Sequence, residues 1–85
     1  MRTRLLLRDS DAFRYGGELD AADLEDVWRQ TEGDPALLGR QLREGDVAYR
    51  ADVYFVLNGD AGWRSLAPGK ETRALYRLIT AEERR

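Results

Sequence analysis

The chain has 85 residues, a formal net charge of −2, and neither cysteine nor histidine. A chain this short buries only about 60% of its unfolded surface, so we expect one domain over residues 1–85. The missing residue types exclude disulfides, thiolate metal sites and the commonest general base. No stretch is apolar enough for a signal peptide or a membrane span, so we expect a cytoplasmic protein without a membrane partner.

The first segment of the chain predicts a β-hairpin. Residues 1–8 alternate apolar and basic side chains, with Leu6 as the one exception, which is typical of a strand with a basic outer face. Residues 9–11 have turn composition, and a second alternating segment follows. We expect Gly16 and Gly17 to end this second strand.

The clearest helical signal comes after the hairpin. Asp20 is a suitable N-cap for a helix over residues 21–31, because its carboxylate can accept hydrogen bonds from the exposed amides of the first turn. The apolar face of this helix consists of Leu24, Val27, Trp28 and Thr31. Asp34 and Pro35 repeat the start signal, but Gly39 weakens a second helix, so we expect only a short helical turn there.

The central segment predicts two strands. Apolar side chains recur at every second position over residues 47–57, which suits an extended chain. The run is about twice the usual strand length, however. A break at residues 50–52 gives strands over residues 47–50 and 52–58. The glycine- and Asn-containing loop 58–62 then turns the chain into another hairpin.

The length of that loop leaves two registers open for Trp63. If Trp63 pairs with Leu57, its indole enters the core. If it pairs with Asn58, the indole lies beside Tyr54 and Val56 on the other face of the sheet. That aromatic patch is then either covered by the C-terminal segment or exposed as a contact site.

The C-terminal segment fits two patterns. Residues 72–80 alternate as in a strand, but their apolar residues also share one helical face. We favour a last strand, followed by a mobile tail over residues 81–85. The chain as a whole is therefore predicted to be α+β, a small antiparallel meander of hairpins with one main helix and a short second helical turn, in the approximate order ββα(α)βββ.

Several short motifs occur in a fixed order along residues 15–66. They are Tyr15-Gly16-Gly17-Glu18-Leu19, Leu24-Glu25-Asp26-Val27-Trp28, Asp34-Pro35, Leu42, Gly45-Asp46-Val47, Tyr54 with Val56, and Gly62-Trp63-Arg64 with Leu66. In order and spacing this set resembles the YodL-like domains. The chain departs from that pattern by lacking a Ser before Leu42, by carrying Trp28 where Phe is commoner, and by having no Gly at the strand break.

The resemblance implies a small accessory protein. YodL-like domains occur in small proteins of phages, plasmids and conjugative elements, and they are not similar to any established enzyme. The resemblance thus implies that the chain acts by binding, with an anti-defence role as one form of that action. It also favours two strands over one long strand in the central segment.

Catalysis has little support in the sequence. The close acidic pairs are Asp9 with Asp11, and Asp46 with Asp52. Both lie beside predicted turns, where carboxylates bond the backbone. No set of nucleophile, base and orienting group can be assembled, so we predict a non-enzymatic protein without a cofactor or metal.

We therefore predict a protein-binding module, monomeric or homodimeric, with another protein as its partner. Aromatic and Arg side chains dominate interface energetics, and three of them are predicted to cluster at one end of the second hairpin. These partner-binding residues are Tyr54, Trp63 and Arg64.

Two hypotheses that involve nucleic acid remain as alternatives. In the first, a basic face binds phosphates through Arg2, Arg4, Arg8 and Arg14. In the second, an acidic helix imitates a phosphate backbone through Asp20, Asp23, Glu25 and Asp26. The acidic middle of the chain and its net charge of −2 oppose the first alternative.

Overall fold

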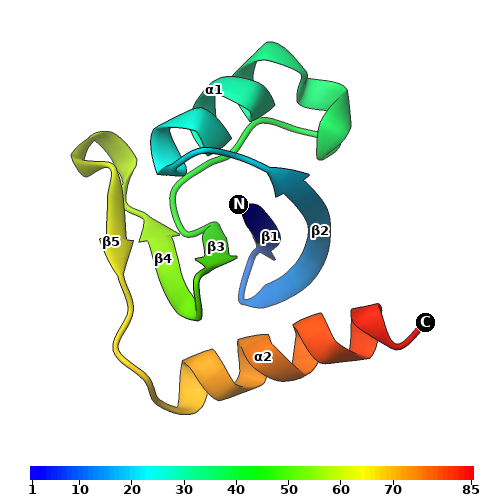
Figure 1. Cartoon of the computed structure of the whole chain (residues 1–85). Coiled ribbons are helices and arrows are strands. Elements are labelled where there is room, and N and C mark those ends of the chain that lie inside the picture. The colour runs from blue at the N-terminus through cyan, green and yellow to red at the C-terminus, as the bar shows by residue number, and fades with distance from the viewer.

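Five antiparallel strands form one twisted sheet in the computed structural model, and a helix covers each face of this sheet (Figure 1). The structure describes residues 1–85 apart from the side chains of Pro35 and Ala61. Its elements are β1 (Arg2–Asp9), β2 (Ala12–Asp20), α1 (Leu24–Gly33), a 3-10 turn (Pro35–Leu37), β3 (Val47–Arg50), β4 (Val53–Leu57), a second 3-10 turn (Gly59–Ala61), β5 (Trp63–Ser65) and α2 (Lys70–Glu83). The strand order across the sheet is β2-β1-β3-β4-β5. The predicted α+β class with an antiparallel sheet is confirmed, with a helix rather than a strand as the last element.

Strand β1, which lies between β2 and β3 in the sheet, buries side chains on both of its faces. Leu5 and Leu7 pack under α1, in a cluster with Val27 and other apolar residues. Leu6 points to the opposite face and packs under α2. Leu6 breaks the alternation because both faces of the sheet are covered by helices. The basic residues of β1 lie beside the covered part of the second face.

The two glycines expected to end β2 lie inside it. Leu5 pairs with Gly17 and Leu6 pairs with Tyr15, so Gly16 is the extra residue of a β-bulge. Gly17 has a φ of 118°, which a residue with a side chain rarely adopts. The prediction is wrong because glycine permits a bulge as well as a strand end, and β2 continues to Asp20.

Helix α1 begins three residues later than predicted. Its N-cap is Asp23, whose carboxylate accepts a hydrogen bond from the amide of Asp26 at 2.8 Å. Asp20 is instead the last residue of β2, and its carboxylate binds the amino terminus at 2.7 Å. Val27 and Thr31 are buried on the inner face of α1, as the spacing predicts.

The predicted break between β3 and β4 is confirmed, and it is a two-residue turn. Arg50 pairs with Val53, and both Ala51 and Asp52 have positive φ, at 52° and 63°. Two consecutive positive φ angles define the type I′ turn that suits the twist of a hairpin. Glycine is the usual residue there, and Ala51 adopts the left-handed conformation at a cost of about 1–2 kcal/mol.

Residues 72–80 form a helix, and the predicted last strand is wrong. Thr72, Leu75 and Ile79 are buried along one side of α2, at helical spacing. The helix covers the face of the sheet that Leu6 and Tyr54 share. Residues 81–83, expected in a mobile tail, also belong to α2. Within the described residues, neither helix is long and apolar enough to cross a membrane.

Candidate functional site: a tryptophan groove with an acidic rim

A groove of about 500 Å³ lies between α1, the loop that precedes β3, and the β4–β5 loop. Its apolar lining is formed by Trp28, Leu42, Leu57 and Trp63. The two leucines are buried in the cluster under α1, so the bottom of the groove is continuous with the core. The groove therefore exposes both tryptophans of the chain above a base of buried core residues.

The register of β5 places Trp63 in this groove. Trp63 pairs with Leu57, which is the first of the two registers that the sequence leaves open. The amide of Asn58 donates to the carbonyl oxygen of Gly62 at 2.8 Å and closes the loop. Cross-strand partners share a face, so the indole packs beside Leu57 on the α1 side and remains partly exposed.

Trp28 comes to the groove from α1. It lies at the edge of the helix's apolar face, and 38% of its surface remains exposed. The sequence identifies it only as a helix-face residue. The signal that could have found it is its size, because a large indole at the edge of an apolar stripe seldom becomes fully buried.

Three carboxylates line the groove beside the tryptophans. They belong to Glu25 of α1, Glu44 of the loop before β3 and Asp60 of the β4–β5 loop. Glu44 lies against the β4–β5 loop, since a Cβ added to Gly59 would be 3.7 Å from its Oε1. All three residues are exposed, and among the described side chains none of these carboxylates forms an ion pair.

Arg43 also lines the groove, but its guanidinium is held elsewhere. Its Nη2 donates to the carbonyl oxygen of Arg8 at 2.9 Å and to Oδ1 of Asp9 at 3.1 Å. The ion pair with Asp9 offsets its charge. The groove therefore has an apolar centre and a negative rim.

Tyr54 and Arg64, predicted to lie with Trp63, are on the other side of the sheet. Tyr54 is buried under α2, where its ring centroid is 4.4 Å from that of Tyr49. Arg64 pairs with Val56, which packs on the same face. The single predicted patch is therefore wrong. The register that takes Trp63 into the core separates it from Tyr54, and Arg64 points away from Trp63 because successive residues of a strand face opposite sides. A binding role for each of them stays a prediction.

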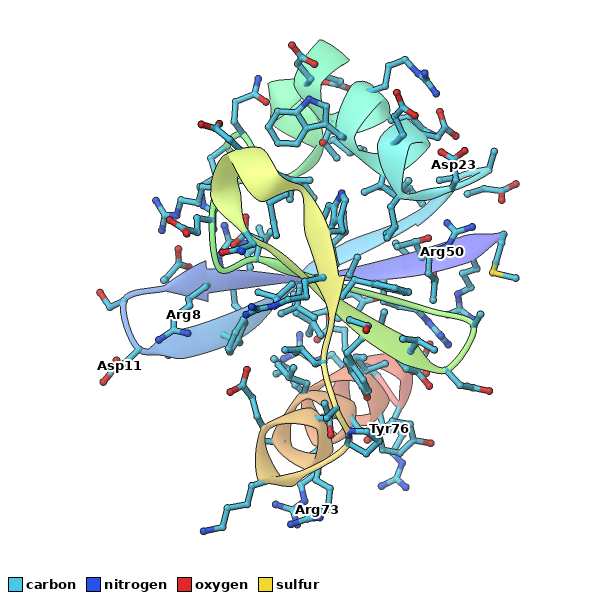
Figure 2. All side chains as sticks on the ribbon, turned by 90° about the vertical axis from the view of Figure 1, so that its left-hand side faces the viewer. Arg8, Asp11, Asp23, Arg50, Arg73 and Tyr76 are labelled. Carbon is cyan, nitrogen blue, oxygen red and sulfur yellow. The ribbon has the colours of Figure 1, made fainter. Side chains whose placement is uncertain are left out.

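A second, shallower recess of about 350 Å³ lies beside α2. It is lined by Tyr49, Tyr54 and Tyr76 together with Arg73 and Arg77. Burial raises the pKa of Tyr54 to about 12, and its hydroxyl has no hydrogen-bond partner in the described part of the chain. Figure 2 shows Arg73 and Tyr76 on α2, at the opposite end of the molecule from α1.

The N-terminal part of the predicted basic face is occupied by contacts within the chain. Arg2 binds Glu18 and donates to Glu83 at 2.6 Å, and Arg4 donates to the same Glu83 oxygen at 2.7 Å. The Arg4 guanidinium also lies 5.5 Å from the centre of the Tyr49 ring. These contacts join β1 to the end of α2 and leave little free charge for phosphates.

Of the other two arginines, Arg8 stays on that face and Arg14 does not. The Arg8 guanidinium lies 5.6 Å from the ring centre of its cross-strand partner Phe13. Arg14 pairs with Leu7 and so lies on the opposite face of the hairpin, where it binds Asp9 at 2.8 Å. The expectation that Arg14 joins the row is therefore wrong, because it is offset by one position in the strand.

Three residues of the predicted acidic face form separate local contacts within the chain. Asp20 binds the amino terminus and Asp23 caps α1. Asp26 accepts a hydrogen bond from the amide of Ala22 at 2.9 Å, which lowers the pKa of its carboxyl. Of the four residues, Glu25 is the one that lines the groove.

The acidic pairs considered for catalysis also have structural partners. Asp46 is fully buried and bound by arginine and backbone donors, and Asp52 accepts a hydrogen bond from the hydroxyl of Tyr49 at 3.0 Å. Asp9 binds arginine side chains, while Asp11 projects from the tip of the β1–β2 hairpin (Figure 2). Within the described residues, no three acidic side chains converge as a metal site would require.

Comparisons of this chain with models of known protein families, with curated proteins and with solved structures found no match.

Proposed function

We propose that this chain is a small, non-enzymatic protein-binding module and that the groove lined by Trp28 and Trp63 receives its partner. The observation that carries the proposal is the pair of tryptophans that line one apolar groove while each keeps part of its surface exposed. Tryptophan is among the residues that dominate binding energy at interfaces, above all where it lines a pocket that excludes water.

The polar groups of the groove favour a protein partner over a small molecule. Small-molecule sites place a few fixed polar groups inside a concave pocket. Here the polar groups are exposed carboxylates on the rim, and the centre is apolar. This is the arrangement of an interface, with an apolar core and a polar border. The resemblance to YodL-like domains extends the proposal to an accessory role in a phage or other mobile element, with anti-defence as one form of that role.

Photocrosslinking in the cells that naturally produce the protein tests this function. We expect p-benzoylphenylalanine in place of Trp28 to give a covalent adduct with a defined protein. The same amino acid in place of Tyr76 is the matched control, because Tyr76 is exposed and lies at the other end of the molecule. Adducts at position 76 alone, or none at position 28, would contradict the proposal.

The variant Trp28→Ala provides the second arm of this test. Trp28 is 38% exposed, so its loss should lower the free energy of unfolding by about 1–3 kcal/mol, which circular dichroism and urea unfolding of the variant measure alongside binding. Partner binding should fall by about tenfold or more, as expected for a central interface tryptophan. Trp63→Ala is less suitable, because Trp63 packs against the core and its removal would also weaken the fold.

Nucleic-acid binding at α2 is the second candidate. The exposed ring of Tyr76 lies in a recess with Arg73 and Arg77, which suits stacking and phosphate contact with a single strand. We would measure the binding of labelled single- and double-stranded DNA at two salt concentrations. Saturable binding that weakens steeply with salt and disappears in Arg73→Gln/Arg77→Gln would favour this candidate over the first.

A further inference from the structure

We propose that the groove selects a basic segment of its protein partner and that an Arg or Lys side chain of that segment lies against the tryptophans, between the rim carboxylates. This inference rests on the proposed function. It adds the chemistry of the partner, which the apolar lining alone does not define.

The charge of the rim is the first reason. Glu25, Glu44 and Asp60 are exposed and line the groove together with its apolar side chains. Arg43, the basic residue of the lining, has its guanidinium bound to Asp9 and to a backbone carbonyl. The groove therefore presents a negative potential that attracts cationic groups and repels acidic ones.

The chemistry of the tryptophans is the second reason. An indole face attracts a cation through its quadrupole, and Trp is the strongest aromatic partner in such contacts. Arg suits this site especially well, because its planar guanidinium is weakly hydrated, stacks on aromatic rings and binds carboxylates through two parallel hydrogen bonds. A basic side chain thus satisfies the centre and the rim together, whereas an acidic one would face like charges.

A second copy of this chain is the competing occupant. Arg73 and Arg77 of α2 are exposed and could enter the groove of a neighbouring molecule. In that case light scattering would show oligomers that dissociate in Arg73→Gln/Arg77→Gln. This result would overturn the assignment of the groove to another protein.

A random peptide library displayed on phage provides the probe. The library is selected on the purified chain and, in parallel, on Trp28→Ala, so that only groove-dependent peptides are kept. We expect these peptides to contain Arg or Lys about threefold more often than the library and to be depleted in Asp and Glu. No groove-dependent peptide, or peptides without this bias, would overturn the inference.

A charge variant then tests the role of the rim. For the best peptide, Glu25→Gln/Glu44→Gln/Asp60→Asn should weaken binding by about tenfold and remove most of its salt dependence. The control Asp11→Asn/Glu32→Gln/Asp34→Asn changes the net charge equally outside the groove and should leave the affinity within about twofold. Equal losses in the two variants would overturn the inference.

The proposed function and this inference fail in different ways. If an adduct forms at position 28 but the crosslinked partner segment contains no basic residue, the groove binds protein and the inference is wrong. If no protein is crosslinked at position 28, the proposed function itself is wrong.

Discussion

The carboxylate of Asp46 is fully buried, and the guanidinium of Arg40 binds both of its oxygens. Nη1 donates to Oδ2 at 2.8 Å and Nη2 donates to Oδ1 at 2.9 Å. The backbone amides of Arg8 and Arg43 donate to the same carboxylate at 2.8 and 2.9 Å. One side chain thus fixes the loop before β3, which supplies part of the groove, to the end of β1.

Removal of this carboxylate should be the most damaging polar change in the chain. Asp46→Ala leaves Arg40 with only its longer contact to Asp9, at 3.8 Å, and two backbone amides without acceptors. We therefore expect a loss of about 3–5 kcal/mol in the free energy of unfolding. A domain of this size has only about 4–13 kcal/mol in total. Urea unfolding measures the change. The exposed pair of Arg29 with Asp26 is the control, and Arg29→Ala should cost about 0.5 kcal/mol or less.

A double variant distinguishes this anchor from an ordinary ion pair. Replacing both partners of a buried pair with apolar residues often restores stability. Arg40→Met/Asp46→Leu should not do so, because the amides of Arg8 and Arg43 still lose their acceptor. Recovery to within about 1 kcal/mol of the native free energy of unfolding would show that the amide contacts contribute little.

The sequence predicts those features of this fold that depend on local chemistry. The first hairpin, the turn at residues 50–52 and the inner face of α1 follow from spacing and turn composition. The identity of the last element cannot be predicted in this way, because the apolar residues of 72–80 fit both the two-residue period of a strand and the 3.6-residue period of a helix. The second face of the sheet decides between them, since Leu6 and Tyr54 need a cover that a helix provides.

The groove is harder to predict because its parts are distant in sequence. The sequence identifies Trp63 as a contact residue, but its face depends on the loop register. Trp28, Glu44 and Asp60 come from three separate segments, and only tertiary packing brings them together. The acidic character of Glu25 is visible in the sequence, but as part of a helix face rather than of a groove.

The start of α1 offers a direct test of the capping assignment. Asp23→Ala removes the carboxylate that accepts from the amide of Asp26, and should destabilise the chain by about 1 kcal/mol. Asp20→Ala removes only an exposed pair with the amino terminus, and should cost about 0.5 kcal/mol or less. Thermal unfolding of both variants measures the difference. A larger loss of stability in Asp20→Ala than in Asp23→Ala would show that Asp20, the N-cap predicted from the sequence, is the capping residue.

The bulge at Gly16 should not tolerate a side chain. A Cβ at this position would lie 2.8 Å from Cγ of Leu7 and 3.2 Å from the carbonyl oxygen of Leu5. We therefore expect Gly16→Ala to cost about 1–3 kcal/mol, as overpacking of a core does. Gly33→Ala is the matched control, because no atom lies within 4 Å of its added Cβ. It should be neutral or stabilising by up to about 1 kcal/mol, and similar losses in both variants would contradict the assignment.

Tyr54 should make the stability of the chain fall in alkaline solution. Burial raises the pKa of its phenol from 10.0 to about 12, so the folded state holds this proton more tightly than the unfolded chain does. The stability that the neutral phenol contributes is fully present below pH 10. It is lost as the pH rises through 12, by about 2–3 kcal/mol in all.

Urea unfolding between pH 8 and pH 12, compared with Tyr54→Phe, measures this contribution. Tyr49 and Tyr15 also have pKa values raised by burial, but they remain in the variant, so the difference between the two curves isolates Tyr54. At neutral pH we expect Tyr54→Phe to be as stable as the native chain or more stable by up to about 1 kcal/mol, because the hydroxyl that it removes is buried without a described partner. Two results would contradict this prediction. A lower stability of Tyr54→Phe at neutral pH would show that the phenol is hydrogen-bonded, and the same loss of stability in alkali as in the native chain would show that its pKa is not raised.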